Sequence, residues 1–472
     1  MNGLHEDLIR IVGETGVLSE AQELAPYLAD VRGHFEGSAQ FVVRPSTAEE
    51  VAAVVARCAQ QSVPILPQGG NTSLCGGSVP LAGERGIVLS LSRMRKVREI
   101  DVANNSMTVE AGCVLAEVQR AAVEAGRFYP VSLGAEGSCQ IGGNIATNAG
   151  GTGVLRYGNT RENVLGLEVV LPDARIWHGL RGLRKDNTGF DLKHLFIGSE
   201  GLLGIITAAT LKLHPLNTHH VTAWMAPVSI DAALEVLALF QSSLGSALTA
   251  FEAMNAAQLQ TVLAQFPDTQ SPLPAGPPWH VLTEVGATAD AAGLRDSLEN
   301  LLQQAIASGL LSDAAVASNE TQRAAMWAIR HNVTDAIKQA GRGIAHDIAV
   351  PVSKIPEFLR RAGPALEQRF PGIEIIICGH LGDGNLHFVP LFTEEAWNAF
   401  PDEQAVIDEV HRMTYGVATE LGGTFSAEHG IGRYLIAEMR EYKSEVELSM
   451  MRAIKRTLDP LGLFNPSKVI PQ

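Results

Sequence analysis

The feature that most constrains this chain is the uneven distribution of its glycines. Fifteen glycines fall within residues 66–153, about two and a half times the ~7% typical of proteins. Many are adjacent, at Gly69-Gly70, Gly76-Gly77, Gly142-Gly143 and Gly150-Gly151. Paired glycines let backbone N–H groups converge and let a ligand approach the main chain closely. We therefore expect this region to form tight loops that can bind an anion.

Regular α/β patterning surrounds these loops. Ser46 and Glu49 have the spacing of a capping box and predict the start of a helix. Apolar periodicity predicts a second helix at 115–125 and strands at 63–67, 87–91, 107–111, 166–171 and 204–213. Beyond residue 215 the pattern predicts longer helices at 230–240, 291–306, 355–369 and 403–421, and strands near 280–284, 344–350 and 373–378. The second half therefore indicates a separate α/β domain.

Length, charge and cysteine content exclude several classes of protein. A chain of 472 residues is too long for one ordinary core, so two or three domains are expected. The formal net charge of −15 would repel phosphate backbones, which argues against nucleic-acid binding. No apolar run approaches the ~20 residues of a membrane-spanning helix, and the N-terminus lacks a signal-peptide pattern. The five cysteines are scattered and never form CxxC, which favours a reducing, cytoplasmic location.

The glycine clusters match none of the common nucleotide motifs, because GxGxxG, Gly-Lys and GxSxG are all absent. However, the segment 67–73 follows a predicted strand and adds the hydroxyls of Thr72 and Ser73 to its glycines. Similar clusters follow at 137–151 and 196–207. Each cluster alone could be an ordinary tight turn. Three of them in one domain favour a bound diphosphate.

A second group of chemically active residues lies in the C-terminal half. His380 and His387 flank a Gly-Asp-Gly-Asn turn that could bring both imidazoles together, and Glu428 and His429 follow some forty residues later. Two histidines and a carboxylate suit a divalent metal that keeps open positions for a substrate. A single histidine of this kind is more often a surface or core residue, and GDGN is also an ordinary hairpin turn. The two strings together favour a metal site.

At this point the chain resembles a known family. The strings PQGGNTSLCGGSVP, AEGSCQIGGNIATNAGGT and LKHLFIGSEGLLGIIT resemble the FAD-binding domain of the vanillyl-alcohol oxidase/p-cresol methylhydroxylase superfamily. HxGDGNxH and AEHG are similar to motifs of its D-2-hydroxyacid dehydrogenase branch, which holds D-2-hydroxyglutarate and D-lactate dehydrogenases. The resemblance implies an α+β fold: a two-lobed FAD-binding domain at 1–216, an α/β cap domain with an antiparallel sheet at 217–432, and a segment at 433–472 that returns to the FAD domain.

The resemblance also implies a cofactor site. FAD is expected to be non-covalent, since the first cradle contains no histidine and Cys75 lies past the usual attachment position. The residues implied to contact it are Pro67, Gln68, Gly69, Gly70, Asn71, Thr72, Ser73, Gly137, Ser138, Ile141, Gly142, Gly143, Asn148, Gly150, Glu200, Gly201, Ile206 and Asn465.

The family's catalytic motifs imply the remaining roles. His380, His387 and Glu428 would bind a divalent metal, with zinc as the expected ion, and His429 would be the catalytic base. Arg330 and Thr334 match positions that bind a substrate carboxylate. The implied reaction oxidises a D-2-hydroxy acid to the 2-oxo acid, with the C2 hydride passing to flavin N5.

The chain departs from the hydroxyglutarate pattern at two positions. Ala345 stands where the hydroxyglutarate enzymes usually have a lysine, and Val389 stands where an asparagine is common. The loss of one charge-assisted contact removes ~1.5–3 kcal/mol of binding. These departures favour a different, more apolar 2-hydroxy acid, while the metal and base residues are retained.

Partners and rival functions follow from the same residues. Without a nicotinamide motif, the expected electron acceptor is a protein or a quinone, and the chain is expected to form a homodimer. One alternative is a flavin oxidase that uses oxygen on a similar hydroxy acid. An alternative from another class is a metal-dependent hydrolase in which His380, His387 and Glu428 activate water. A non-catalytic binding protein is the least favoured, since it gives no reason for metal and base residues to occur together.

Overall fold

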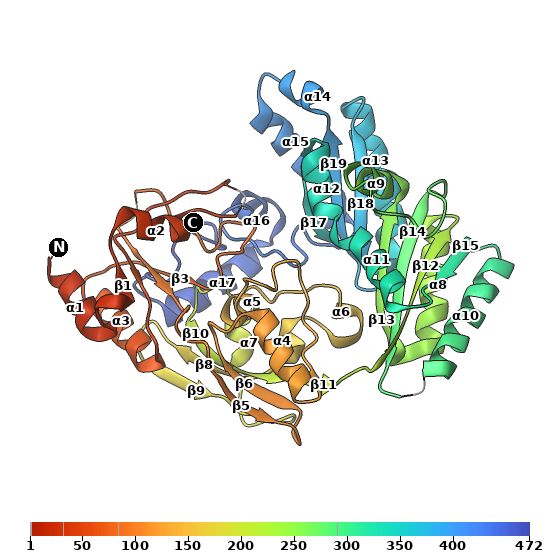
Figure 1. Ribbon diagram of the computed structural model, residues 1–472. Helices are drawn as coiled ribbons and strands as arrows, with labels where there is room; N and C mark the ends of the chain where they lie inside the picture. The colour runs from red at the N-terminus through yellow and green to blue at the C-terminus, as the bar shows by residue number, and fades with distance from the viewer. Residues whose placement is uncertain (1, 32, 84, 290) are drawn as a thin grey trace. The chain divides into compact units, whose positions relative to one another are not determined.

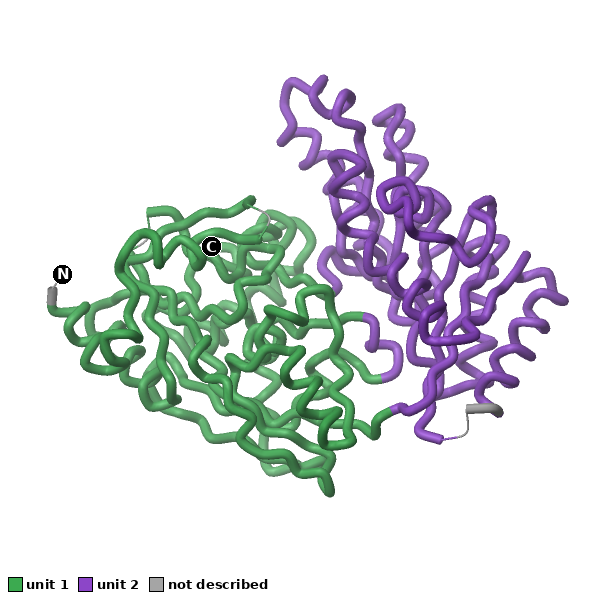
Figure 2. The backbone as a smooth tube through the Cα atoms, viewed as in Figure 1, with its two compact units in different colours: residues 1–151, 157–216, 428–472 green, residues 152–156, 217–427 purple. Residues whose placement is uncertain are grey.

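The structure is a computed structural model that describes residues 2–31, 33–83, 85–289 and 291–472. Figure 2 shows that the chain divides into two compact units. Unit 1 comprises residues 1–151, 157–216 and 428–472, and unit 2 comprises residues 152–156 and 217–427. Unit 1 therefore combines the N-terminal part of the chain with its C-terminal segment.

The N-terminal part of unit 1 is built on a small, largely parallel sheet. Within the described residues this sheet has four strands in the order β1 (Val17–Leu18), β2 (Phe41–Val43), β4 (Ile87–Ser90) and β3 (Ile65–Gln68). β2 and β3 both pair with β4 in parallel. Parallel strands need a crossover between them, and helix α3 (Ala48–Gln60) provides the one from β2 to β3 (Figure 1).

Helix α3 begins one residue later than the capping-box spacing predicted. Thr47 is the N-cap and accepts the Glu50 N–H at 3.1 Å, while the Ser46 N–H donates to the Glu50 carboxylate at 2.7 Å. Ser46-x-x-Glu49 and Thr47-x-x-Glu50 have the same spacing. The sequence therefore predicted the helix correctly but assigned its cap to the wrong one of two adjacent pairs.

A second, antiparallel sheet completes the core of unit 1. In the described part of the chain it has the strand order β5 (Val97–Asp101), β6 (Ser106–Glu110), β10 (Ile205–Lys212), β8 (Val164–Val170) and β9 (Ile176–Gly179). Val51 of α3, Val109 of β6 and Val169 of β8 belong to one buried hydrophobic cluster, so the helix and this sheet share a core.

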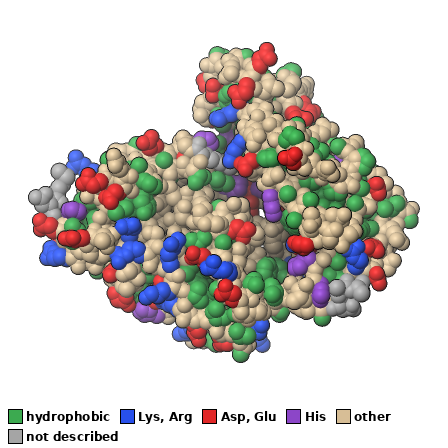
Figure 3. All heavy atoms as spheres, viewed as in Figure 1, with side chains coloured by type: hydrophobic (Ala, Val, Ile, Leu, Met, Phe, Trp, Pro, Cys, Tyr) green, Lys and Arg blue, Asp and Glu red, His purple; other side chains and the backbone are tan. Residues whose placement is uncertain are grey.

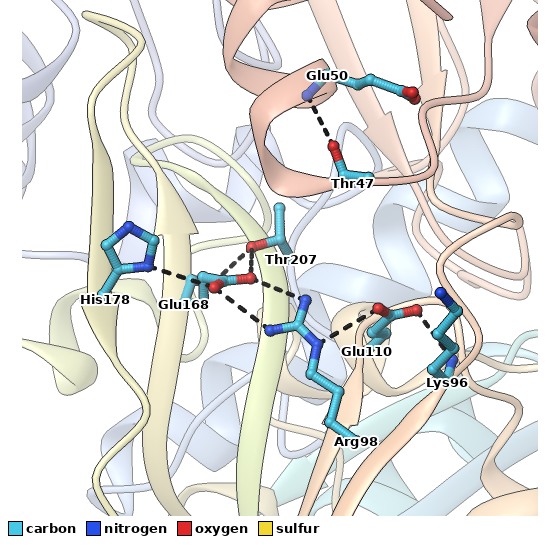
Figure 4. A network of polar contacts seen from close by, with 8 residues as sticks. All are labelled: Thr47, Glu50, Lys96, Arg98, Glu110, Glu168, His178 and Thr207. Carbon is cyan, nitrogen blue, oxygen red and sulfur yellow. Dashed lines mark hydrogen bonds and ion pairs between the residues drawn. The ribbon is translucent and has the colours of Figure 1, made fainter.

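Two buried carboxylates beside this core, Glu110 and Glu168, are paired with the more exposed Arg98. Figure 4 shows Arg98 between two carboxylates: its Nε lies 3.3 Å from Glu110 and its Nη2 lies 3.1 Å from Glu168. Thr207 also donates to Glu168 at 3.0 Å. Burying a charge is tolerated when it is paired and hydrogen-bonded. We therefore interpret this network as structural.

The remaining elements of unit 1 are short or peripheral. They are α1 (Asn2–Val12), η1 (Glu14–Gly16), α2 (Ala21–Leu28), α4 (Leu115–Glu124), β7 (Arg127–Phe128), α5 (Ile141–Ala146), η2 (Thr160–Asn163), α7 (Lys193–Phe196), β11 (His214–Pro215), α16 (Ile436–Tyr442) and α17 (Glu445–Leu458). Helix α6 (Val154–Tyr157) lies at a boundary between the units. The expectation of tight loops in the cluster at 137–151 was wrong in part, because residues 141–146 form helix α5.

Unit 2 is organised around one large sheet whose pairings are all antiparallel, as the resemblance implied. Within the described residues, its strand order is β15-β12-β14-β13-β18-β19-β16, with β17 also paired to β19. The strands are β12 (His219–Pro227), β13 (Leu248–Asn255), β14 (Trp279–Ala287), β15 (Leu311–Val316), β16 (Arg342–Gly343), β17 (His346–Ala349), β18 (Glu374–His380) and β19 (Asn385–Phe392).

Helices pack on both faces of this sheet. Alternate residues of a strand face opposite sides, so Phe251 and Glu252 of β13 lie on different faces. Helices α9 (Ala256–Gln265), α11 (Glu320–His331) and α12 (Val333–Ala340) share a hydrophobic cluster with Met254, which places them on the Glu252 face. The remaining helices are α8 (Ile230–Leu244), η3 (Gly245–Ala247), α10 (Ala291–Ala307), η4 (Val352–Lys354), α13 (Ile355–Arg369), α14 (Glu394–Asn398) and α15 (Glu403–Glu420).

The surface carries mixed charge. On the face shown in Figure 3, Lys and Arg side chains are interspersed with Asp and Glu side chains rather than gathered in one basic patch. Among the helices that the structure describes, none is both long and apolar enough to cross a membrane.

Candidate functional site

The first candidate site is a cradle in unit 1 that begins where β3 ends. A Cβ added to Gly70 would lie 2.1 Å from the Ser138 carbonyl oxygen, and one added to Gly69 would lie 3.4 Å from the Gln140 Cβ. A 2.1 Å contact is impossible for real atoms, so glycine is required at position 70. The two predicted glycine segments, about seventy residues apart in sequence, therefore meet directly.

A cavity of about 360 Å³ opens at this meeting point. It is lined by Pro26, Tyr27, Gln68, Gly69, Gly70, Asn71, Ser90, Ser92, Arg95, Val114, Gly137, Ser138 and Gln140. Gln140 is only 6% exposed, yet its Oε1 has no hydrogen-bond partner among the described residues. A buried polar atom without a partner is costly unless a ligand satisfies it. The cavity therefore has the character of a polar ligand site, and its residues fit the phosphate or sugar groups of a dinucleotide.

Two of the predicted cofactor residues hold the cradle together through their side chains. The Gln68 amide donates to the carbonyl oxygens of Tyr27 at 3.0 Å and Ser78 at 2.7 Å. The Asn71 amide donates to Ala29 at 2.8 Å, and its backbone has a φ of 54°, in the left-handed region that asparagine tolerates. Both side chains thus attach the end of helix α2 to the cradle, which closes one wall of the cavity.

The other predicted cofactor residues of unit 1 extend along the same loops. Ser73 lies beside Gly77, Asn148 accepts the Arg161 N–H at 2.9 Å, and Ile206 is buried in β10. The remaining members are Pro67, Thr72, Ile141, Gly142, Gly143, Gly150 and Gly201. Gly201 has a φ of 76° and packs against Pro67, which brings the third glycine segment next to the first.

Glu200 has a specific role within unit 1. Its carboxylate accepts the backbone N–H of Ile431 at 2.8 Å and of Gly432 at 2.9 Å. Burial raises the pKa of the Glu200 carboxyl above its usual value, and the two N–H donors and the positive charge of Lys468 oppose this rise. The carboxylate therefore anchors the segment that directly follows His429.

The C-terminal segment attaches to the same point of unit 1. Asn465 is only 1% exposed, and its amide donates to the carbonyl oxygens of Glu200 at 2.7 Å and Gly77 at 3.2 Å. Lys468 donates to the Asn465 Oδ1 at 2.7 Å, so the asparagine is held from both ends. Asn465 thus connects the C-terminal segment to the glycine loops at Gly77 and Glu200.

Glu428 and His429 lie on the loop that these contacts fix. The Arg433 N–H donates to the Cys75 carbonyl oxygen at 2.9 Å, and a Cβ on Gly150 would lie 2.8 Å from a Glu428 carboxylate oxygen. His429 Nε2 lies 3.8 Å from Glu428 Oε1. Within unit 1, the predicted base and the predicted carboxylate ligand therefore adjoin the glycine loops.

The second candidate site lies on the sheet of unit 2. Strands β18 and β19 form a hairpin across the Gly-Asp-Gly-Asn turn, and the rings of His380 and His387 have centroids 5.8 Å apart. Gly384 has a φ of 83°, and a Cβ there would lie 2.1 Å from the Val350 carbonyl oxygen. The predicted turn does bring the two imidazoles together, and glycine is required to form it.

A buried carboxylate that the sequence analysis missed holds this site. Glu252 of β13 is 1% exposed, and its Oε1 lies 2.7 Å from His380 Nδ1. Arg330 Nε donates to the other oxygen, Oε2, at 2.8 Å. Burial by itself would raise the pKa of Glu252, but its contacts with His380 and Arg330 lower it to about 2.

The signal for Glu252 was present in the sequence. Residues 248–255, LTAFEAMN, form an apolar run interrupted by one charge. A charge within such a strand requires a partner, and this pattern indicates a functional or paired glutamate. The partners could not be found from sequence, because His380 lies 128 residues away.

Asp347 is a second missed carboxylate in unit 2. It is 6% exposed on β17, directly across from His387 in the strand register, and its Oδ1 lies 3.9 Å from His387 Nδ1. Asn385 donates to the same oxygen at 2.9 Å. The Ala427 N–H donates to the Asp347 backbone oxygen at 3.0 Å, and Glu428 is the next residue of the chain. The Asp347 carboxylate on β17 thus lies beside His387, a predicted metal ligand, on β19.

The two predicted substrate residues differ in their surroundings. Arg330 is largely buried in the last turn of α11 against Glu252. Thr334 is exposed in the first turn of α12. Arg330 thus belongs to the histidine cluster of unit 2, while Thr334 presents its hydroxyl to solvent.

Comparison with protein families assigns both halves of the chain. Residues 39–179 match a family model described as "FAD binding domain", and residues 216–469 match one described as "FAD linked oxidases, C-terminal domain". The chain belongs to the FAD-linked oxidase family. The glycine cradle and the cavity lining, apart from Pro26 and Tyr27, therefore lie within a matched FAD-binding domain.

Similar proteins carry names from the D-2-hydroxyacid dehydrogenase branch of this family. A D-2-hydroxyglutarate dehydrogenase of Xanthomonas citri pv. viticola is 37% identical over 96% of this chain and 93% of its own length. The mitochondrial D-2-hydroxyglutarate dehydrogenase of Rattus norvegicus is 36% identical over 96% of this chain and 82% of its own length. A putative mitochondrial D-lactate dehydrogenase of Schizosaccharomyces pombe is 32% identical over 98% of this chain and 88% of its own length. This FAD-linked oxidase is thus similar to enzymes named for two different hydroxy acids.

Solved structures support the fold. p-Cresol methylhydroxylase aligns with a TM-score of 0.77 at 16% identity, covering 99% of this chain and 96% of that chain. A 4-ethylphenol oxidase from Gulosibacter chungangensis aligns with a TM-score of 0.71 at 20% identity, covering 100% of this chain and 97% of that chain. The p-cresol methylhydroxylase type of fold expected from the sequence is therefore confirmed.

Proposed function

We propose that this FAD-linked oxidase is an FAD- and divalent-metal-dependent dehydrogenase that oxidises a D-2-hydroxy acid to the corresponding 2-oxo acid. The observation that carries the proposal is the cluster in unit 2, where the His380 imidazole and the Arg330 guanidinium converge on Glu252 and the His387 ring lies 5.8 Å from the His380 ring. Imidazoles suit a divalent metal, and a guanidinium suits a carboxylate. A 2-hydroxy acid presents a carboxylate beside an alcohol, and so matches both.

The residues of unit 1 would hold the flavin. The cradle at 67–73 and the segment at 137–143 supply backbone N–H groups, and Gln140 supplies an Oε1 acceptor that has no partner among the described residues. FAD, when bound, supplies the hydride acceptor. The buried position of Cys75 and the absence of histidine in the cradle support a non-covalent flavin.

The residues of unit 2 would hold the substrate carboxylate and supply two of the metal ligands. We assign His380, His387 and Glu428 as ligands, with zinc as the expected ion, because imidazole and carboxylate ligands suit that metal. The metal, when bound, supplies a Lewis acid for the substrate hydroxyl. Arg330 would bind the carboxylate, with Thr334 beside it on the next helix.

His429 would take the proton from the substrate hydroxyl. An imidazole accepts a proton near neutral pH, which is the task of a base in alcohol oxidation. The Glu200 contacts to Ile431 and Gly432 hold the loop that carries His429, so the base has a fixed backbone position.

The substrate is proposed to have no second carboxylate. Ile344 donates to Pro390, and His346 pairs with Phe388, so Ala345 lies across from Val389 on the neighbouring strand. The two departures from the hydroxyglutarate pattern are therefore adjacent: Ala345 directly precedes β17, which carries Asp347, and Val389 lies on β19 with His387. Val389 is 3% exposed and packs with Ile376 and Leu391. An apolar pair at this place favours a monocarboxylic hydroxy acid with an apolar side chain.

An anaerobic comparison of enantiomers tests this function. The purified yellow protein is mixed without oxygen with D- or L-2-hydroxy acids of increasing side-chain length, and the loss of flavin absorbance is followed. We expect D-enantiomers to bleach the flavin and L-enantiomers to leave it oxidised. A colourless protein, or a flavin that no D-2-hydroxy acid reduces, would contradict the proposal.

A further inference from the structure

The Glu252 carboxylate contacts two residues with different proposed roles, the metal ligand His380 and the carboxylate-binding Arg330. One oxygen lies 2.7 Å from the ring of His380, and the other lies 2.8 Å from Arg330. Glu252 is 1% exposed, and His380 is 7% exposed. The pairing is set by the sheet, because Glu252 and His380 are direct neighbours in the register of β13 and β18. The carboxylate thus has one fixed place between them.

This geometry fixes the chemical form of His380. A carboxylate paired with an arginine accepts hydrogen bonds and donates none. His380 Nδ1 must therefore carry a proton, which leaves the Nε2 lone pair as the ligating atom. In metal sites, a carboxylate that accepts from the second ring nitrogen orients the imidazole and raises its basicity.

We propose that Glu252 is a positioning residue that holds His380 in the metal-binding tautomer and, through its second oxygen, holds Arg330 in the direction of the substrate carboxylate. The proposal rests on the proposed function, since it assumes that His380 is a ligand. It goes further because one side chain, Glu252, would support both the metal ligand and the arginine. A change at Glu252 should therefore weaken both metal binding and substrate binding.

The same helix offers a matched control. Arg323, Trp327 and Arg330 occupy one stripe of α11, with the spacing that places residues on the same helix face. Arg323 Nε and Trp327 Nε1 donate to the buried Glu284 of β14, at 2.8 Å and 2.9 Å. Glu284 lies on the same sheet face as Glu252 and is equally paired with an arginine, but none of its described contacts is with a predicted metal ligand.

The test compares Glu252→Gln with Glu284→Gln in the holoenzyme. Zinc affinity is measured by competition with a chromophoric chelator, and KM and kcat are measured for a D-2-hydroxy acid that the wild type oxidises. We expect E252Q to weaken zinc affinity by about 10- to 100-fold and to raise KM. We expect E284Q to match the wild type in zinc affinity and KM, even where its thermal stability falls.

The outcomes separate this inference from the function on which it rests. If wild-type protein binds no zinc, the metal role fails. If wild type binds zinc and E252Q binds it equally well, or if E284Q weakens it as much, Glu252 has no positioning role. Should E252Q not fold, Glu252→Asp carries the test. Its shorter side chain cannot reach both partners in place, so unchanged zinc affinity together with unchanged KM would overturn the proposal.

Discussion

Two glutamates, one in each unit, anchor a histidine with a proposed role in different ways. Glu200 of unit 1 accepts two neutral backbone N–H groups and fixes the loop after His429. Glu252 of unit 2 accepts from an imidazole and a guanidinium, and fixes the His380 side chain itself. Burial raises the pKa of Glu200, whereas the contacts of Glu252 with His380 and Arg330 outweigh burial and lower the pKa of Glu252 to about 2.

The difference follows from the tasks proposed for the two histidines. A base must change protonation during the reaction, and Glu200 fixes the loop of the proposed base through backbone N–H groups rather than through its ring. A metal ligand must keep one tautomer, so a carboxylate on its ring is an advantage. We therefore expect variants at Glu200 to slow flavin reduction and variants at Glu252 to weaken zinc binding.

The largest effect is expected for His429→Asn. Removal of a general base lowers rates by about 10²- to 10⁴-fold, so anaerobic flavin reduction should nearly cease while the flavin stays bound. Rapid-mixing absorbance measures the rate, and the oxidised spectrum reports flavin retention. A variant that is reduced at the wild-type rate would refute the assignment of His429 as the base.

Glu200→Gln should slow flavin reduction without altering the metal site. A glutamine amide offers one acceptor oxygen, so one of the two N–H groups at 431 and 432 loses its partner. An unpaired buried N–H costs about 1–3 kcal/mol, and we expect reduction to slow by about 5- to 100-fold.

Zinc competition on the same sample provides the control for E200Q. The comparison predicts wild-type zinc affinity for this variant, in contrast to E252Q. Equal loss of zinc affinity in E200Q and E252Q would break the distinction between the two anchors.

Ala345→Lys should change the preference of unit 2 for its substrate. Position 345 is exposed beside the strand that carries Asp347, so a lysine there can meet a second substrate carboxylate. A charge-assisted contact adds about 1.5 kcal/mol at the low end, or roughly tenfold in kcat/KM for D-2-hydroxyglutarate. Ala399→Lys is a surface control that adds the same charge elsewhere in unit 2. If both lysines act alike, or neither does, the proposed substrate class is not set at position 345.

The smallest expected effect is a loss of folding stability in unit 2 at acid pH. His346 and His411 of unit 2 contact each other at 2.9 Å, and burial lowers the pKa of both, that of His411 to about 4. The unfolded chain, with a histidine pKa near 6.5, therefore binds more protons below that pH. The stability of the neutral pair is complete above about pH 6.5 and is lost as the pH falls toward 4, by roughly 1 kcal/mol for His411 at pH 5.5.

Amide hydrogen exchange at pH 7 and pH 5.5 measures this effect peptide by peptide. We expect protection to fall more in β17 and α15 of unit 2 than in the sheets of unit 1. His411→Gln, which cannot be protonated, should flatten the pH dependence. Equal loss in both units would show that the histidine pair does not set acid sensitivity.

The sequence predicted local features well and distant contacts poorly. The helix at 355–369 matches α13 in full, and the GDGN turn predicted the β18–β19 hairpin, because both depend on neighbouring residues. The sequence could not reveal that Glu200 reaches residues 431 and 432, or that Glu252 reaches His380, because such contacts arise only when distant segments pack. Helix α5 was missed because its two glycines, Gly142 and Gly143, favour loops locally, while close packing against Ala111 requires a small residue at 142.

The most direct test of the account is removal and return of the metal in a single-turnover experiment. Wild-type protein is stripped with a chelator, checked for bound flavin, and mixed anaerobically with its best D-2-hydroxy acid before and after zinc is added back. The account predicts that the stripped protein keeps its yellow flavin oxidised and that zinc restores bleaching. Bleaching at an undiminished rate by fully stripped protein would contradict it.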